Sequence, residues 1–148
     1  MRNKTIYLLL VISTTLAMSC SRSDDADPII ENTKSVSDCG IEIEDNTSVS
    51  ICLNGTDSAL PNEIITFAST FYSKNDNPSN TLFLWTIESG NIEILNIENS
   101  IYGEIAKSIV TIKFNADYTG NAIIAINAEN INGAGSREHI IELESDNL

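Results

Sequence analysis

Basic residues are scarce in this sequence. Its 148 residues include 8 lysines and arginines against 21 aspartates and glutamates, which gives a formal net charge of −13. Proteins that bind nucleic acids need a patch or stripe of basic side chains to neutralise phosphates, and the sequence has none. We therefore expect no nucleic-acid partner, and we expect the acidity mainly to keep the protein dispersed.

Residue patterns that carry common enzyme chemistry are also missing. His139 is the only histidine, and the alternating stretch around it places it on the solvent face of a strand. There is no G-x-S-x-G elbow, no H-E-x-x-H pair and no glycine-rich phosphate loop. A glycosidase-type carboxylate pair stays open, because 21 acidic residues allow many spatial pairs. We expect no catalytic residues and no cofactor, so the protein is predicted not to be an enzyme.

Metal-binding patterns are equally sparse. Two cysteines, Cys39 and Cys52, and one histidine do not complete a tetrahedral zinc site. The loops Asn54–Asp57 and Lys74–Asn77 concentrate oxygen donors of the kind that calcium binds. Neither loop has the spaced D-x-D-x-D-G pattern with a distal glutamate, and turns use the same residues for backbone reasons. We expect no metal site.

No apolar run is long enough to cross a membrane comfortably. The longest follows Arg2 and Lys4, covers Ile6–Ile12 and ends in serines and threonines, whereas a spanning helix needs about 20 apolar residues. Cations, a short apolar run and small residues before Cys20 are typical of a cleaved export signal.

The stretch Leu16–Cys20 resembles the bacterial lipoprotein signal, in which the cysteine at the cleavage point is lipidated and becomes the mature N-terminus. This resemblance implies a signal peptide over residues 1–19 and a membrane anchor on Cys20. An ordinary secretory signal, with Cys20 incidental, is the alternative and would leave the protein soluble. Removal of residues 1–19 leaves six basic residues against 21 acidic ones, a net charge of −15.

An acidic stretch follows the cysteine. Residues 20–37 include Asp24, Asp25 and Asp27 among small polar residues, a composition that predicts a solvated linker. Acidic residues just after a lipidated cysteine also resemble the surface-export signal of Bacteroidetes-type lipoproteins. This resemblance implies an outer-membrane lipoprotein exposed on the cell surface.

With Cys20 assigned to lipid, Cys39 and Cys52 remain as an even pair in an oxidising compartment. Such a pair favours a disulfide. Two free or buried thiols are the alternative.

Beyond the linker, apolar residues recur at every second position between turn-forming residues, and no segment has a helical stripe. The expected strands are Ile41–Glu44, Ser48–Leu53, Glu63–Tyr72, Leu82–Glu88, Ile92–Ile97, Ser108–Asn115, Asn121–Asn130 and Arg137–Glu144. The expected inward-facing residues are Ile65, Phe67, Phe83, Trp85, Val110, Ile112, Phe114, Ile124, Ile126 and Ala128. Residues 38–148 are thus predicted to form an all-β, antiparallel sandwich of seven to eight strands.

Three stretches in this region carry a further resemblance: Phe83–Gly90, Ile109–Phe114 and Tyr118–Asn130. They resemble the PKD-like, immunoglobulin-like β-sandwich domain, in which a tryptophan strand precedes a hairpin, a hydrophobic strand, a glycine turn and a strand ending in Ala-x-Asn. The resemblance covers Leu60 to Leu143 and departs at Asn132–Ser136, where many relatives have a cysteine. Relatives serve as spacers, adhesion modules or carbohydrate-associated domains, so it implies a fold more than an activity.

Aromatic side chains can serve as ligand platforms, because their rings stack on sugars. Trp85 lies on an alternating strand and is expected in the core. Tyr72, Tyr102 and Tyr118 lie near strand ends, where packing over the rim of the sandwich is the plainer interpretation. The ligand-binding residues stay unknown, and two functions stay open: an interaction module for a protein or glycan, or a structural spacer or accessory subunit of an envelope complex.

Overall fold

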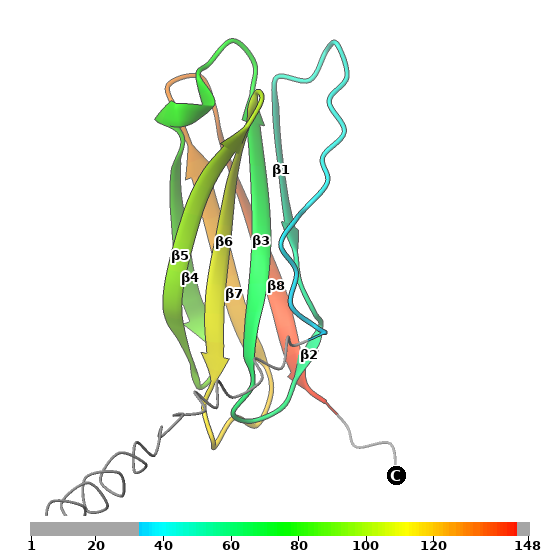
Figure 1. Cartoon of the computed structure of the whole chain (residues 1–148), viewed down its shortest axis with the longest axis vertical. Helices are drawn as coiled ribbons and strands as arrows, with labels where there is room; N and C mark the ends of the chain where they lie inside the picture. Colours follow the sequence, from blue (N-terminus) through cyan, green and yellow to red (C-terminus); the bar gives the residue numbers. More distant parts are fainter. Residues whose placement is uncertain (1–32, 145–148) are drawn as a thin grey trace, which may run out of the picture. The chain divides into compact units, whose positions relative to one another are not determined.

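Alternating apolar residues build eight strands, which form two four-stranded sheets (Figure 1). The strands are β1 Val49–Asn54, β2 Ser58–Ala59, β3 Ile64–Ser73, β4 Leu82–Ser89, β5 Ile92–Tyr102, β6 Ile105–Phe114, β7 Ala122–Glu129 and β8 Ala134–Leu143, with a 3-10 turn, η1, at Pro78–Asn80. One sheet has the order β1-β3-β6-β5 and the other β2-β8-β7-β4. All pairs are antiparallel except β2 with β8. The predicted all-β sandwich is confirmed.

This structure is a computed structural model, and it describes residues 33–144. The predicted signal peptide, the Cys20 anchor and the aspartates at 24–27 lie outside the described residues. In the described part of the chain, no helix has the length and apolarity needed to span a membrane.

The core fills the space between the sheets with the residues that the alternation selected. Nine of the ten predicted inward-facing residues are buried, and the tenth, Phe83, is half-buried against them. Trp85 is 5 % exposed, and its indole Nε1–H donates to the hydroxyl of Ser108 in the opposite sheet at 2.9 Å. Trp85 is therefore a core residue, as predicted, and it also links the two sheets.

The predicted strand Ile41–Glu44 does not form. Residues 34–44 instead run as irregular chain along the β1 side of the first sheet. β1 pairs with β3 only from Ala68 to Ser73, and Val36, not Ile41–Glu44, bonds to the part of β3 that β1 does not cover. The disulfide to Cys52 and the hydrogen bond from Thr70 hold Cys39 off a strand path. The two-residue β2 was missed because it is too short to show alternation.

His139 does not lie on the solvent face of β8, and that prediction was wrong. Its side chain is 16 % exposed, and its ring meets the Phe67 ring edge-on at 5.7 Å. Nε2 lies 2.9 Å from the carbonyl oxygen of Thr56 and 3.3 Å from a carboxylate oxygen of Asp57. The fully buried Ile141, two residues on, shows that odd-numbered residues of β8 face inward here.

The segment before β1 is fastened to the edge and to the outer face of β3. Val36 N–H donates to the Thr66 carbonyl at 3.1 Å, and the Thr70 hydroxyl donates to the Cys39 carbonyl at 2.7 Å. The predicted disulfide between Cys39 and Cys52 is present, with the two Cα atoms 6.1 Å apart, inside the usual range. The outer face of the sheet is therefore covered on the β1 side.

The fastening begins at Lys34, a residue that the sequence assigned to the linker. Its ammonium group contacts a carboxylate oxygen of Glu63 at 2.8 Å and also pairs with Glu144. Desolvation lowers the pKa of Lys34, but hydrogen bonds and charge attraction from Glu144 and Glu63 outweigh it, so the pKa is raised overall. The N-terminal end of the described chain is thus tied to the end of the sandwich where β3 starts and β8 finishes.

Candidate interaction surface

The two long sides of the sandwich differ. On one side, β1 is overlaid by the fastened N-terminal segment. On the other, β4 and β5 are the outermost strands of their sheets, and the chain crosses from one sheet to the other between them at Gly90 and Asn91 (Figure 1). The β4–β5 side is therefore the place to look for side chains that the fold leaves uncovered.

Inward-facing residues of β5 are exposed there. The register pairs Ile97 with Val110 and Ile101 with Ala106. Val110 and Ala106 are at most 2 % exposed, yet Ile97 is 41 % and Ile101 52 % exposed. The second sheet ends at β4 and does not reach over this half of β5, so two isoleucines on the core side of the sheet lie against solvent.

A hollow of about 200 Å³ lies at this opening between the sheets. Residues from η1, β4 and β5 line it, among them Thr81, Phe83, Asn99 and Ile101. The hydroxyl oxygen of Thr81 is buried and has no hydrogen-bond partner within the described part of the chain. The opening is thus a shallow recess with both polar and apolar side chains in its wall and an unsatisfied polar atom among them.

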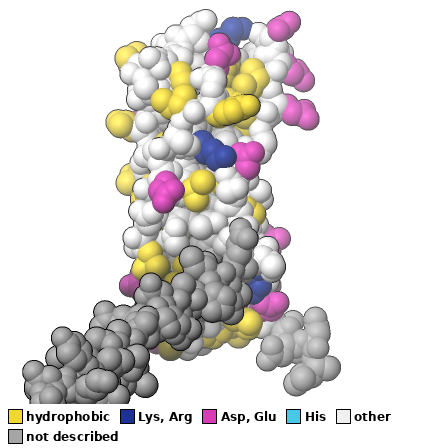
Figure 2. Space-filling view, in the orientation of Figure 1, with side chains coloured by type: hydrophobic (Ala, Val, Ile, Leu, Met, Phe, Trp, Pro, Cys, Tyr) yellow, Lys and Arg dark blue, Asp and Glu magenta, His cyan; other side chains and the backbone are white. Residues whose placement is uncertain are grey.

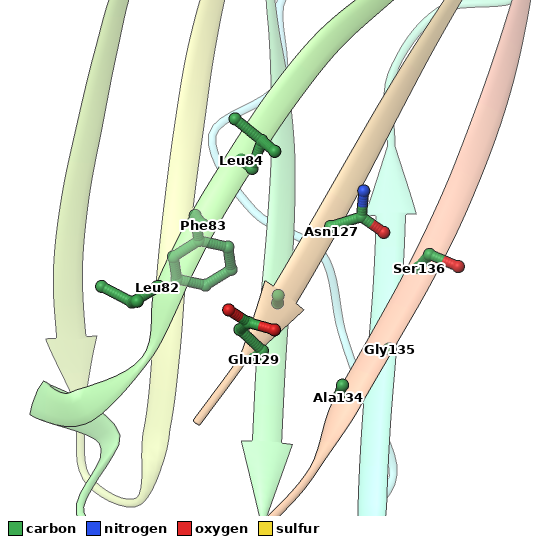
Figure 3. Close-up of a pocket in the computed structure, with 9 residues that line it drawn as sticks. Leu82, Phe83, Leu84, Asn127, Glu129, Ala134, Gly135 and Ser136 are labelled. Atoms are coloured by element: carbon green, nitrogen blue, oxygen red, sulfur yellow. The ribbon is translucent and has the colours of Figure 1, made fainter. Parts of the chain in front are cut away.

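A second hollow, of about 560 Å³, lies across the outer face of β4, β7 and β8 (Figure 3). Leu82 and Leu84 line it from β4, Asn127 and Glu129 from β7, and Ser136 from β8. Phe83 lines both hollows. Strand β4 therefore separates two adjoining recesses, and its side chains contribute to each.

We call six apolar side chains on this side of the sandwich the open flank: Leu82, Phe83 and Leu84 of β4, and Ile97, Ile101 and Tyr102 of β5. Leu82, Leu84 and Tyr102 are 68, 59 and 82 % exposed. Figure 2 shows hydrophobic side chains along the flank where β4 and β5 run. Neither strand contains a lysine or an arginine, and both carry glutamates. The open flank is therefore apolar with acidic neighbours.

Only one of the three tyrosines considered from the sequence is available to a ligand. Tyr102 belongs to the open flank, whereas Tyr72 and Tyr118 are buried. Tyr118 stacks edge-on against Phe114 at 4.9 Å and donates its hydroxyl to the Ile141 carbonyl at 2.7 Å. Burial raises the pKa of Tyr118. Tyr118 therefore closes the core at the turn between β6 and β7.

The loop at Lys74–Asn77 uses its carboxylate for turn structure. Asp76 accepts hydrogen bonds from the backbone of Asn77 at 2.7 Å and of Asn132 at 3.3 Å, and from the Asn80 side chain at 3.2 Å. Desolvation raises the pKa of Asp76, but these hydrogen bonds and one from Ile131 lower it overall. Asp76 thus ties the loop after β3 to the loop after β7. Across residues 33–144, no three His, Cys, Asp or Glu side chains gather as a metal site would require.

No protein-family model matches this chain, and no curated protein matches it either. The open flank was also absent from the sequence-based expectations. Alternation identifies which face of a strand is apolar, and it carries no information about how far the opposite sheet extends. The one available signal was the run Leu95–Tyr102, whose isoleucines continue past the predicted end of the strand at Ile97.

Proposed function

We propose that this protein is a lipid-anchored lipoprotein of the bacterial outer membrane, exposed on the cell surface, and that its PKD-like sandwich is a non-catalytic interaction module. The observation that carries the interaction role is the open flank. Its exposed apolar side chains adjoin two recesses on one side of the sandwich. Contiguous exposed apolar surface on a soluble domain usually marks a place where a partner binds.

The location rests on the N-terminal residues. The stretch Leu16–Cys20 and the acidic residues after it supply the anchor and the surface-export signal. A single acyl chain binds membranes only marginally, whereas the two or three chains of a lipoprotein hold it there stably. Cys20→Ser is expected to abolish labelling by radioactive palmitate and to move the protein from the membrane to the soluble fraction. Unchanged membrane association of the variant would refute the anchor.

The acidic stretch has its own test. Replacement of Asp24, Asp25 and Asp27 by alanine is expected to protect the protein from protease added to intact cells, while palmitate labelling continues. Equal digestion of variant and wild type would leave the protein lipid-anchored but would remove the export role of these aspartates.

The interaction role is tested by site-specific photocrosslinking in the cells that make the protein. A benzophenone amino acid at Leu84, in the open flank, is expected to crosslink to a protein partner and give a discrete adduct. For a glycan partner, the same variant is expected to give a weaker signal than the wild type on a glycan array. Ile140, on the outer face of β8, is 56 % exposed and serves as the matched control position. A structural spacer or accessory subunit without a ligand of its own predicts no adduct and no array signal at either position.

A further inference from the structure

We propose that the open flank binds an extended segment of another protein, which pairs with β5 as an additional strand and carries alternating apolar and basic side chains. This inference rests on the proposed interaction role and names the class of partner. It follows from the edge of β5, from the exposed side chains on its inner face and from the charge on its outer face.

The edge of β5 lacks the usual protection against pairing. Edge strands are commonly blunted by proline, by lysine, by bulges or by being very short. β5 has eleven residues with neither proline nor lysine, and its one register irregularity lies between Ile94 and Asn96. From Asn96 to Tyr102 its register with β6 is regular. Seven consecutive residues therefore present a backbone edge that pairs with no strand of residues 33–144.

The other edges of the two sheets differ from β5. β1 is half-buried and is bonded through Cys52 to the overlying segment. β2 pairs with β8 only at Glu142 and Leu143, and the inward-facing Ile141 of β8 is fully buried. β4 is regular over Leu82–Ile87, and its inward-facing Trp85 is buried. Within the described part of the chain, a long regular edge and exposed inward-facing isoleucines thus coincide on β5.

A strand added to β5 would cover the isoleucines that the second sheet leaves exposed. Neighbouring strands lie about 4.8 Å apart, and alternate side chains point to the same face. The inward-facing side chains of an added strand would therefore lie beside Ile97 and Ile101 and over the recess lined by Phe83 and Thr81. Apolar side chains at every second position of the partner would fill this place.

The charge on the outer face of β5 favours a partner with basic side chains. Glu93 is paired with Lys113 at 2.8 Å. Glu98 is exposed, and it accepts a hydrogen bond from the Asn96 side-chain amide at 2.9 Å. A strand added along Asn96–Tyr102 would place an outward-facing side chain beside Glu98, and opposite charges on neighbouring strands stabilise the pair. Lysine or arginine between the apolar positions fits this face.

A second copy of the chain fits less well. Its own β5 carries Glu93 and Glu98 and no basic residue, so pairing of two β5 strands would oppose glutamates. The net charge of −13 adds repulsion between copies. The charge of the open flank therefore favours a different, basic polypeptide as the partner.

The test uses synthetic nine-residue peptides and the processed full chain purified in detergent. The probe alternates lysine and valine. One control peptide has proline at the central valine, which keeps the charge but removes a backbone donor, and another has glutamate in place of lysine. We expect the probe to bind and each control to bind at least tenfold more weakly. Amides in Asn96–Tyr102 should exchange hydrogen more slowly in the presence of the probe.

Two double variants control for charge. Ile97→Lys with Ile101→Lys places cations on the open flank, and Ile64→Lys with Ile140→Lys places the same number on exposed sites of β3 and β8. The first pair is expected to weaken binding of the probe at least tenfold and the second to leave it within about twofold. Folding of both is checked by the fluorescence of Trp85.

Several results would overturn strand addition. They are no binding of the probe below about 1 mM, equal binding of the proline peptide, equal weakening by both double variants, or no protection of the β5 amides. A dimer of the free protein that Ile101→Lys dissociates would show that the occupant is a second copy. Each of these results is compatible with a crosslinked adduct at Leu84, so the interaction role would still stand. The interaction role itself is refuted by the absence of that adduct together with the absence of any signal on the glycan array.

Discussion

The hydrogen bond between Trp85 and Ser108 offers a quantitative test of how the two sheets are held together. The indole Nε1–H and the serine hydroxyl are 2.9 Å apart, and the residues are 5 % and 0 % exposed. Ser108→Ala removes the acceptor and leaves the indole N–H buried without a partner. A buried polar group left unsatisfied costs about 1–3 kcal/mol. The lost hydroxyl is small, so a cavity contributes little.

Urea unfolding measures this cost. Trp85 is the only tryptophan, so its fluorescence reports on the bond itself, and circular dichroism provides a second probe. Ser108→Ala is expected to lower the free energy of unfolding by about 1–3 kcal/mol. Ser100→Ala, on the exposed part of β5, is the control and should change it by less than about 0.5 kcal/mol.

A double-mutant cycle separates the hydrogen bond from packing. Trp85→Phe removes the donor, so adding Ser108→Ala to it leaves no orphaned indole N–H. The two changes together should therefore cost less than the sum of the single changes, by about 1 kcal/mol or more. Strictly additive costs, or a Ser108→Ala variant as stable as wild type, would refute the view that this bond joins the sheets.

Three further predictions concern single features of the fold. Reduction of the Cys39–Cys52 disulfide should lower the free energy of unfolding by about 3 kcal/mol in urea titrations with and without reductant; equal midpoints would contradict this. Gly55→Ala should lower the free energy of unfolding by about 1–3 kcal/mol, because the added Cβ would lie 2.0 Å from the Phe67 ring. The control is Gly40→Ala, whose Cβ would meet no atom within 4 Å and which should leave the melting temperature nearly unchanged. Burial raises the pKa of Tyr118 above its ordinary value of 10.0, so the stability from its neutral phenol is complete below about pH 10 and is lost as the pH rises through the raised pKa. Tyr118→Phe should therefore weaken the protein by about 1 kcal/mol at pH 8 and flatten the alkaline fall; an unchanged pH profile would show that another group titrates.

Much of the core could be predicted from the sequence, because apolar residues at every second position of a strand all point to the same face, and here that face is buried. In β6, polar residues flank Ile112 and Phe114 on both sides, and both apolar residues are fully buried. β8 shows the limit. Ile140 and Ile141 are adjacent, one 56 % exposed and the other fully buried, so the sequence does not say which parity faces inward. His139 was assigned to the wrong face for this reason.

The open flank could not be predicted for a different physical reason. Ile97 and Ile101 have the alternation of core residues, and their position in the strand is inward. Their exposure depends on the width of the opposite sheet, which is set by pairing between strands far apart in the chain. The alternation of apolar and polar residues shows which face of a strand is apolar. Whether that face is covered depends on how the two sheets assemble.

The disulfide also decides how the domain responds to mechanical force. A pull on the N-terminal end of the described chain first meets Lys34 and then the hydrogen bonds to β3. Beyond Cys39 the pull passes through the covalent bond to Cys52 and bypasses the chain between them, a separation of 13 residues. That stretch, about 45 Å when extended, stays out of reach of the force until the bond is reduced. Redox state therefore sets how far the domain can lengthen before β1 is loaded along its own axis.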